Sequence, residues 1–134
     1  SARLDYRVTG HGAAHAIGCL GPADEFCRRT HELRLDGEPL TELTPWRVDC
    51  AQLCNMTPND SGYGPISYCA ENPCGDPASV RAPRANWCPG SMTPPIAIED
   101  PALLVPGSHE FSRSIQGLAS GGSWLVSATY FAFE

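Results

Sequence analysis

Apolar and polar side chains alternate through both ends of the chain. Alternation runs through residues 4–9 and again through residues 29–36, where it stops at Asp36-Gly37. A period of two predicts half-buried β-strands, and Asp-Gly predicts a turn between strands. A short partner strand is expected near Leu40 to Leu43. The glycine-rich segment Gly10-His11-Gly12 is expected to end the first strand as a loop.

Strand patterns return after Pro94-Pro95. They cover residues 96–99, 108–115 and 123–133, with a glycine-rich turn cluster before the last. There is no convincing helical pattern and no internal repeat. Antiparallel strands separated by Gly and Pro turns favour a β-sandwich over a helical fold. Trp46 and Trp124 are assigned to packing.

Residues 45–93 are rich in Cys, Pro, Asn, Gly and Asp and hold five of the seven cysteines. A structureless loop of that length is unusual in a compact domain unless disulfides hold it. We therefore expect a disulfide-stapled excursion over one face of a single domain spanning residues 1–134. A zinc site is the alternative, but Cys50–Cys54 and Cys69–Cys74 do not have the spacing of paired Cys-x-x-Cys motifs.

The seven cysteines indicate an oxidising compartment: secreted, periplasmic or cell surface. Cys19 is available to Cys27, and an odd number leaves one thiol free or paired with another chain. The length of 134 residues suits one core. A net charge of −6 gives no support for nucleic-acid binding, and no apolar run approaches a membrane span. No signal peptide is present, and the start at Ser1-Ala2 suggests that the native protein is longer.

Two segments carry the candidate chemistry, Glu25-Phe26-Cys27-Arg28-Arg29-Thr30-His31 and Arg84-Ala85-Asn86-Trp87-Cys88-Pro89-Gly90. Together with Thr9-Gly10-His11-Gly12 and Asp49-Cys50, in this order, they resemble the C-terminal domain of the peptide:N-glycosidase F family. The resemblance runs from about Val8 to the last strand.

The resemblance implies one of two eight-stranded antiparallel jelly rolls packed side by side. The implied reaction is hydrolysis of the amide between asparagine and the first N-acetylglucosamine of an N-glycan. Glu25 then corresponds to an active-site glutamate at the domain interface, and Arg84 and Trp87 line the same cleft. His11 and Phe26 join them as substrate-binding candidates, and Cys50 and Cys88 correspond to a family disulfide.

The chain departs from the family pattern at several positions. The aspartate thought essential lies in an N-terminal jelly roll that this chain does not contain. Ala23 replaces a cysteine, so Cys27 is expected to pair elsewhere, with Cys19 as a candidate. His11 stands where the family has a cleft tryptophan, and Ala13 replaces a histidine. The stretch with the remaining three cysteines looks like an insertion.

From the residues alone, each candidate also has a structural interpretation. Glu25 can supply one half of an acid–base pair, or it can be a surface carboxylate paired with Arg28 or Arg29. Trp87 can stack on a pyranose while Arg84 forks onto sugar oxygens. Alternatively, Trp87 is a core residue beside a disulfide and Arg84 faces solvent.

These observations lead to two main hypotheses. The first is one half of a two-domain amidase that binds an N-glycan or glycopeptide and is active only with an N-terminal jelly roll. The second is a secreted binding or structural module that has lost the reaction. A copper-dependent monooxygenase-like domain is a third alternative, because the superfamily includes such enzymes. Its candidate ligands are His11, His15, His31, His109, Met56 and Met92. No His-x-His pair is present, His31 and His109 alternate with core positions, and we expect no metal or cofactor.

Overall fold

Eight short or medium antiparallel strands and four single-turn helical segments make up the computed structural model, which describes residues 1–134. The strands are β1 (Ala2–Gly12), β2 (His31–Leu35), β3 (Glu38–Leu43), β4 (Met56–Pro58), β5 (Ser67–Cys69), β6 (Ile96–Ile98), β7 (Phe111–Ile115) and β8 (Gly122–Ala132). The α-helices are α1 (Cys50–Leu53) and α2 (Pro77–Arg81), and the 3₁₀ turns are η1 (Asp24–Phe26) and η2 (Pro101–Leu104). The prediction of an all-β sandwich of about eight strands is confirmed.

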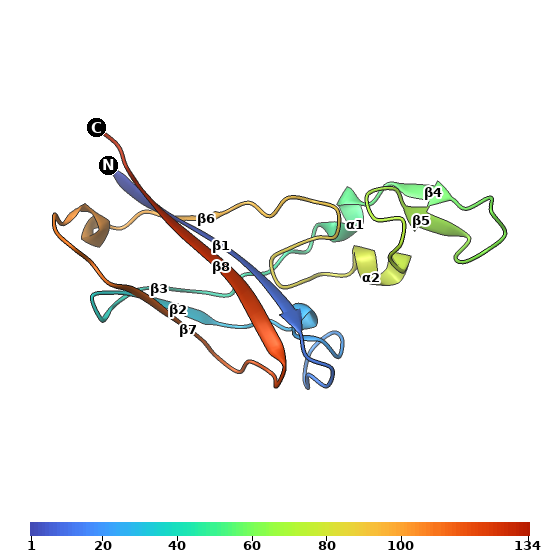
Figure 1. Ribbon diagram of the computed structural model, residues 1–134, viewed down its shortest axis with the longest axis horizontal. Coiled ribbons are helices and arrows are strands. Elements are labelled where there is room, and N and C mark those ends of the chain that lie inside the picture. The colour runs from blue at the N-terminus through green and yellow to red at the C-terminus, as the bar shows by residue number, and fades with distance from the viewer.

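Two three-stranded sheets face each other, in the orders β6-β1-β8 and β3-β2-β7 (Figure 1). β1 and β8 pair over their whole length, from Ala2 with Ala132 to Gly12 with Gly122. β2 and β3 join through the predicted turn, where Asp36 and Gly37 have φ values of 53° and 81°. Two successive positive φ values define the turn type whose twist suits a hairpin, and Gly adopts them without cost.

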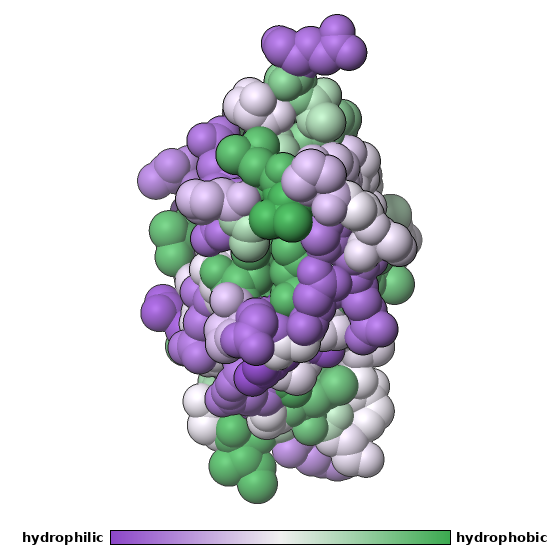
Figure 2. Space-filling model, turned by 90° about the vertical axis from the view of Figure 1, so that its left-hand side faces the viewer, coloured by the Kyte–Doolittle hydropathy of each residue, from purple (hydrophilic) through white to green (hydrophobic).

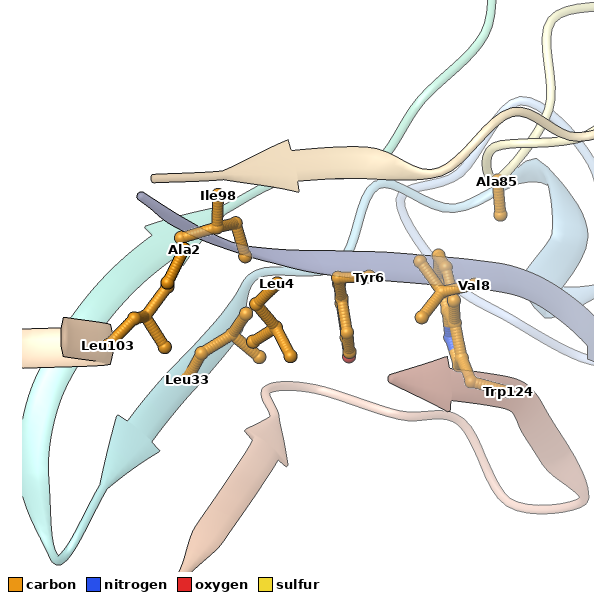
Figure 3. Close-up of a cluster of buried hydrophobic side chains, with 9 residues drawn as sticks. All are labelled: Ala2, Leu4, Tyr6, Val8, Leu33, Ala85, Ile98, Leu103 and Trp124. Carbon is orange, nitrogen blue, oxygen red and sulfur yellow. The ribbon is translucent and has the colours of Figure 1, made fainter. Parts of the chain in front are cut away.

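The core lies between the two sheets and is formed mainly by the alternate residues of β1 (Figure 3). β1 contributes Leu4, Tyr6 and Val8, which are at most 5% exposed. Leu33 comes from β2, and Trp124 from β8 lies at one end of the cluster. Trp46 packs against the cluster from outside. Both tryptophans assigned to packing therefore have that role.

Several expected boundaries are wrong. β1 continues through Gly10 and Gly12 instead of ending in a loop, because these residues pair with Trp124 and Gly122 of β8. Position 10 has room only for glycine. A Cβ there would be 2.7 Å from the Ala85 Cβ and 2.8 Å from Trp124. β7 begins at Phe111 rather than at residue 108. His109 lies in the preceding loop instead, where Asp36 and the Val105 carbonyl bind its ring.

The cysteine-rich excursion has more regular structure than predicted and lies elsewhere. It contains α1, α2 and the β4–β5 hairpin, although no helix was expected. Figure 1 shows these elements beyond one end of the sandwich rather than over one of its faces. The disulfides join Cys19 to Cys27, Cys50 to Cys88 and Cys54 to Cys69, and Cys74 is free and exposed.

The opposite end of the sandwich, where both termini lie, is apolar. Leu104, Val105 and Tyr130 are each more than half exposed there, and Figure 2 shows apolar side chains between polar flanks at this end. A cavity of about 410 Å³ lies beneath η2, lined mostly by leucine and aromatic side chains. No helix has the length and apolar character needed to cross a membrane.

Candidate functional site

The candidate site forms where η1, the end of β1 and the segment 84–88 meet. The backbone N–H of Ala85 donates to the Glu25 carbonyl at 2.7 Å, and the N–H of Gly10 donates to the Ala85 carbonyl at 3.0 Å. The segment 84–88 therefore links η1 to the C-terminal end of β1. The fold brings together the two segments that the sequence analysis singled out, although about 60 residues separate them along the chain.

A buried carboxylate next to Glu25 fixes η1 in place. Asp24 is fully buried. One of its oxygens, Oδ1, accepts hydrogen bonds from Arg29 Nη2 at 2.6 Å, Arg29 Nε at 3.1 Å and the Ala119 N–H at 3.3 Å. The other, Oδ2, accepts from the indole N–H of Trp124 at 3.2 Å. A buried charge is tolerated only when it is paired and hydrogen-bonded in this way. Asp24 thus joins η1 to β8 and determines the direction in which Glu25 projects.

Glu25 makes its ion pair with Arg84, at 2.7 Å from Nη1. The Glu25 side chain is 23% exposed, whereas that of Arg84 is 4% exposed. The guanidinium carbon of Arg84 lies 4.7 Å from the centre of the Phe26 ring and 4.8 Å from that of the Trp87 ring. Both distances are within the range of cation–π attraction.

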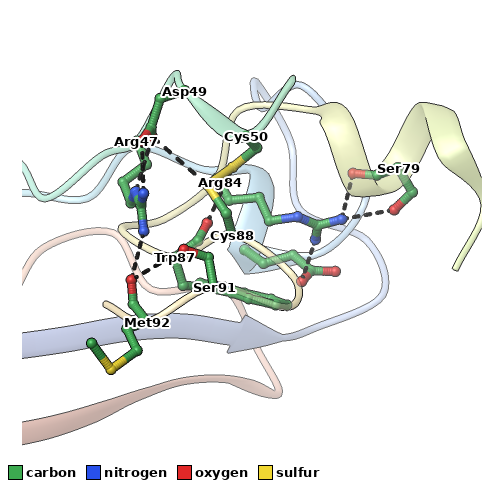
Figure 4. The surroundings of a disulfide bond; sticks show 10 residues. Arg47, Asp49, Cys50, Ser79, Arg84, Trp87, Cys88, Ser91 and Met92 are labelled. Carbon is green, nitrogen blue, oxygen red and sulfur yellow. Dashed lines mark hydrogen bonds and ion pairs between the residues drawn. A yellow bond between two sulfur atoms is a disulfide. The ribbon is translucent and has the colours of Figure 1, made fainter. Parts of the chain in front are cut away.

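Most of the hydrogen-bonding capacity of Arg84 is used inside the protein. Nη2 donates to the carbonyl oxygen of Ser79 at 2.5 Å and to its hydroxyl at 2.8 Å (Figure 4). Nη1 binds Glu25, and the buried Nε has no partner. A guanidinium so engaged cannot also fork onto a sugar from outside. Arg84 is therefore arranged to orient Glu25, and Glu25 keeps the surface that a ligand could reach.

Trp87 is held against the end of β1 by a hydrogen bond from its indole N–H to the Gly10 carbonyl at 2.9 Å. The His11 ring lies beside it, with ring centres 5.0 Å apart. Burial lowers the pKa of His11; the nearby Glu25 carboxylate opposes that effect and Arg84 adds to it. His11, Phe26 and Trp87 are all only partly buried. The aromatic groups and the carboxylate thus lie close together, and each is partly open to solvent.

The Cys50–Cys88 disulfide anchors the far side of this segment (Figure 4). Arg47, which pairs through its backbone with Arg84, places its guanidinium 2.7 Å from an Asp49 oxygen. That hydrogen bond lowers the pKa of Asp49. Asp49, Cys50 and Cys88 are the one group of three potential metal-binding side chains that lie close together. Because both sulfurs are in a disulfide, this group is not a zinc site.

Comparison with known proteins places this chain in a family. The family described as Peptide-N-glycosidase F, C terminal matches residues 1–130. The chain belongs to this family. Its fold is similar to PNGF-II in a P21 crystal form, with 30% identity, a TM-score of 0.61, and coverage of 96% of this chain and 22% of that one. PNGF-II in a C2 form gives 26% identity, a TM-score of 0.60, and coverage of 96% and 21%.

Recombinant peptide:N-glycanase F itself shares the fold at 19% identity, with a TM-score of 0.51 and coverage of 96% of this chain and 38% of that one. No curated protein matches the sequence. From the coverages given above, the chain spans about a fifth to two fifths of the length of the solved structures that it resembles. Family membership and the three disulfides are typical of an extracellular protein.

Within this member of the peptide-N-glycosidase F family, the neighbouring arginines do not pair with Glu25. Arg29 binds Asp24, and Arg28 lies over the Trp46 ring at 5.2 Å. Asp24 and Ser79 were not among the site residues predicted from the sequence. Asp24 lies next to Glu25 in the sequence, but only its burial and its contacts with Ala119 and Trp124, far along the chain, distinguish it from a surface acid.

The histidines proposed as copper ligands are spread over the molecule. His31 is fully buried beneath Tyr6, whose hydroxyl lies 2.9 Å from its Nδ1. Burial, with a smaller contribution from Arg113, lowers the pKa of His31 to about 4. His109 is bound by Asp36 outside the core, and His11 lies beside the candidate site. No group of three potential ligands includes a histidine.

Proposed function

We propose that this chain supplies one half of a glycan-binding cleft in a peptide-N4-(N-acetyl-glucosaminyl)asparagine amidase, with Glu25 as its active-site carboxylate. Family membership supports this reaction class. The observation that carries the proposal is the Glu25–Arg84 pair, in which the cation is buried between two aromatic rings and the carboxylate stays partly open to solvent. This is the arrangement of a positioned carboxylate at a ligand surface.

Hydrolysis of the glycan–asparagine amide requires one group that activates water and one that protonates or polarises the leaving amide. Glu25 is the only acidic side chain in direct contact with Arg84, so this surface provides one such group. As a hydrogen-bond acceptor it can orient an amide N–H, a sugar hydroxyl or a water molecule. The second group has to come from outside residues 1–134, and an N-terminal jelly roll of the same protein is the proposed source.

Recognition of the sugar falls to the aromatic side chains. The apolar face of a pyranose packs on an indole or phenyl ring, and Trp87 and Phe26 both retain exposed surface beside Glu25. His11 extends this surface along β1 and can donate or accept a hydrogen bond. In this proposal Arg84 is a positioning residue that acts through Glu25. The proposed ligand is the N-acetylglucosamine core of an N-glycan or glycopeptide.

A second candidate function is that of a non-catalytic binding or structural module in a secreted, periplasmic or cell-surface protein. The burial of Arg84 and its two bonds to Ser79 favour it, because an ion pair so enclosed can serve stability alone. His11 already contacts Trp87 and covers part of the indole. The copper-dependent alternative has no comparable support, since its ligands do not converge.

Titration of the purified chain with chitobiose and with a high-mannose glycopeptide, followed by NMR, tests the proposal. We expect millimolar binding with shifts centred on the indole N–H of Trp87, lost in Glu25→Ala and in Trp87→Ala. Glu42→Ala on β3 is the matched control, because it removes an exposed carboxylate away from the site. Unchanged binding in both site variants, or no binding at millimolar ligand in a folded protein, would favour the module.

Activity is tested separately. The 134-residue chain alone is expected to release no free glycan from a denatured glycoprotein, because it holds only one of the two required groups. Release by this chain, abolished by Glu25→Ala, would show that the chemistry does not need a second domain.

A further inference from the structure

The outer edge of β8 differs from the other edges of the two three-stranded sheets. β8 is 11 residues long and pairs only with β1, so one row of backbone N–H and C=O groups has no strand beside it. Residues 122–132 contain neither a charged residue nor a proline. Natural proteins protect free sheet edges with charged residues, prolines, bulges or short strands, because an unprotected edge tends to pair with a strand of another chain.

The other edges of these two sheets have such protective features. β3 has Glu38, Pro39 and Glu42 within six residues. β6 is three residues long and follows Pro94-Pro95. β7 is five residues long with Arg113 at its centre. β8 in contrast exposes apolar side chains along its length, with Leu125 at 67%, Tyr130 at 52% and Phe131 at 38% exposure.

The side of the sandwich next to this edge is also open. A hollow of about 290 Å³ separates β8 from β7, lined by Val126 and Ala128 on one side and by Phe111 and Arg113 on the other. Ala128 is exposed although it lies on the inward-facing side of its sheet. The edge and the adjoining hollow are therefore both incomplete, and a strand added to β8 would cover the two together.

The backbone pattern identifies which groups face outward. Ser1 and Phe133 exchange both backbone hydrogen bonds, and Ala13 donates to Gly121 in the same register. In an antiparallel pair such bonded residues alternate with unbonded ones. The odd-numbered residues of β8 therefore bond to β1, and the even-numbered ones, 124 to 132, direct their N–H and C=O groups to the free edge.

We propose that a second copy of this chain pairs with β8 through its own β8, antiparallel, with the two-fold axis at Ala128. In this register only outward-facing backbone groups meet, and each bonded pair exchanges two hydrogen bonds. The side chains match as well: Val126 faces Tyr130 of the other copy, Leu125 faces Phe131, and Ser127 faces Thr129. No charged residue is opposed, and the two sheets become one continuous six-stranded sheet. A two-fold contact of this kind is self-complementary by construction.

Sedimentation analysis at protein concentrations of roughly 1–200 µM tests the oligomeric state of the chain, and a dimer is expected at the highest concentrations. Ala128→Lys brings two ammonium groups face to face at the axis and is expected to weaken association at least tenfold; Ala128→Glu acts in the same way with carboxylates. An equimolar mixture of the two variants should dimerise again, which excludes misfolding as the cause. Thr41→Lys, which places the same charge on guarded β3, is the control and should leave the dimer unchanged.

Cross-linking tests the register. In a Cys74→Ser background, Ser127→Cys with Thr129→Cys should form an interchain disulfide, because unbonded opposite residues lie about 4.5 Å apart. Ser127→Cys alone should not, since the diagonal distance is about 7–8 Å. Efficient cross-linking by the single variant would move the axis to Ser127 and overturn the proposed register. A chain that stays monomeric at 200 µM, without cross-links, would overturn the dimer and leave this edge to another segment of a longer polypeptide.

Discussion

The buried Asp24 carboxylate gives the sharpest prediction for stability. Replacing Asp24 with Asn keeps the shape of the side chain but removes its charge and one acceptor. Both bonds from Arg29 and that from Ala119 end on one oxygen, and the bond from Trp124 ends on the other. The amide NH₂ group must therefore face a donor whichever way it is turned. No rotamer of Asn satisfies all of these donors.

The expected cost follows from these contacts. A hydrogen bond to a charged partner contributes about 1.5–3 kcal/mol and a neutral one about 1, while a buried donor left unpaired costs about 1–3 kcal/mol. Arg29 is only 13% exposed, so water compensates little. Asp24→Asn should lower the free energy of unfolding by about 3 kcal/mol. Asp24→Ala, which leaves the arginine without its partner, should lower it by about 4 kcal/mol.

Urea unfolding with the disulfides intact measures these changes, and Glu42→Gln on the exposed β3 edge should stay within about 0.5 kcal/mol of the parent. A double-mutant cycle separates the contact with Trp124. Trp124→Phe should cost about 1–2 kcal/mol less in the Asp24→Asn background, because the amide oxygen is expected to face the Arg29 guanidinium, which leaves the indole N–H without an acceptor to lose. A loss below 1 kcal/mol for Asp24→Asn would refute the view that this carboxylate anchors η1.

Two further predictions concern the core and the disulfides. His31 has a folded-state pKa of about 4, below its usual 6.5. The contribution of its neutral imidazole to the free energy of unfolding is therefore complete above pH 6.5 and is lost as the pH falls to 4. The loss should reach about 3 kcal/mol. Denaturation at several pH values between 7 and 4 should show that the free energy of unfolding depends less on pH in His31→Gln than in the parent. Equal slopes would contradict a neutral buried imidazole. Replacing Cys50 and Cys88 together by Ser, 38 residues apart, should cost up to about 4 kcal/mol of global stability. The same change at Cys54 and Cys69 should loosen only the β4–β5 hairpin, as hydrogen exchange would show.

The alternating segments were predictable because their signal is local. β1 and β2 bury alternate residues, and the Asp36-Gly37 turn follows from the conformations that these two residues accept. The boundary of β1 was not predictable in the same way. Gly10 looks like a loop residue in the sequence, yet it is the only residue that fits beneath Ala85 and Trp124.

The partners in the candidate site were less predictable, because they depend on tertiary contacts. Glu25 had two cations within four residues, and its actual partner is Arg84, 59 positions away. Arg29 pairs with the more deeply buried Asp24 instead of with Glu25. The bond from Arg84 to Ser79 depends on α2, in a segment for which the sequence predicted no helix. Sequence reasoning located the segments, and only the fold determined which charges meet.

The way in which Glu25 is supported bears on how a second domain would meet this surface. Three separate devices fix its surroundings: Asp24 beneath η1, the bond from Trp87 to Gly10, and the Cys50–Cys88 disulfide. None of them needs a ligand or another domain. A surface fixed beforehand loses little conformational entropy on binding, so the cost of closing a cleft would fall mainly on the approach of the other half. Weak but site-specific sugar binding by this chain alone is therefore what a preformed half-cleft predicts, whereas a surface assembled only on docking would bind nothing until its partner arrived.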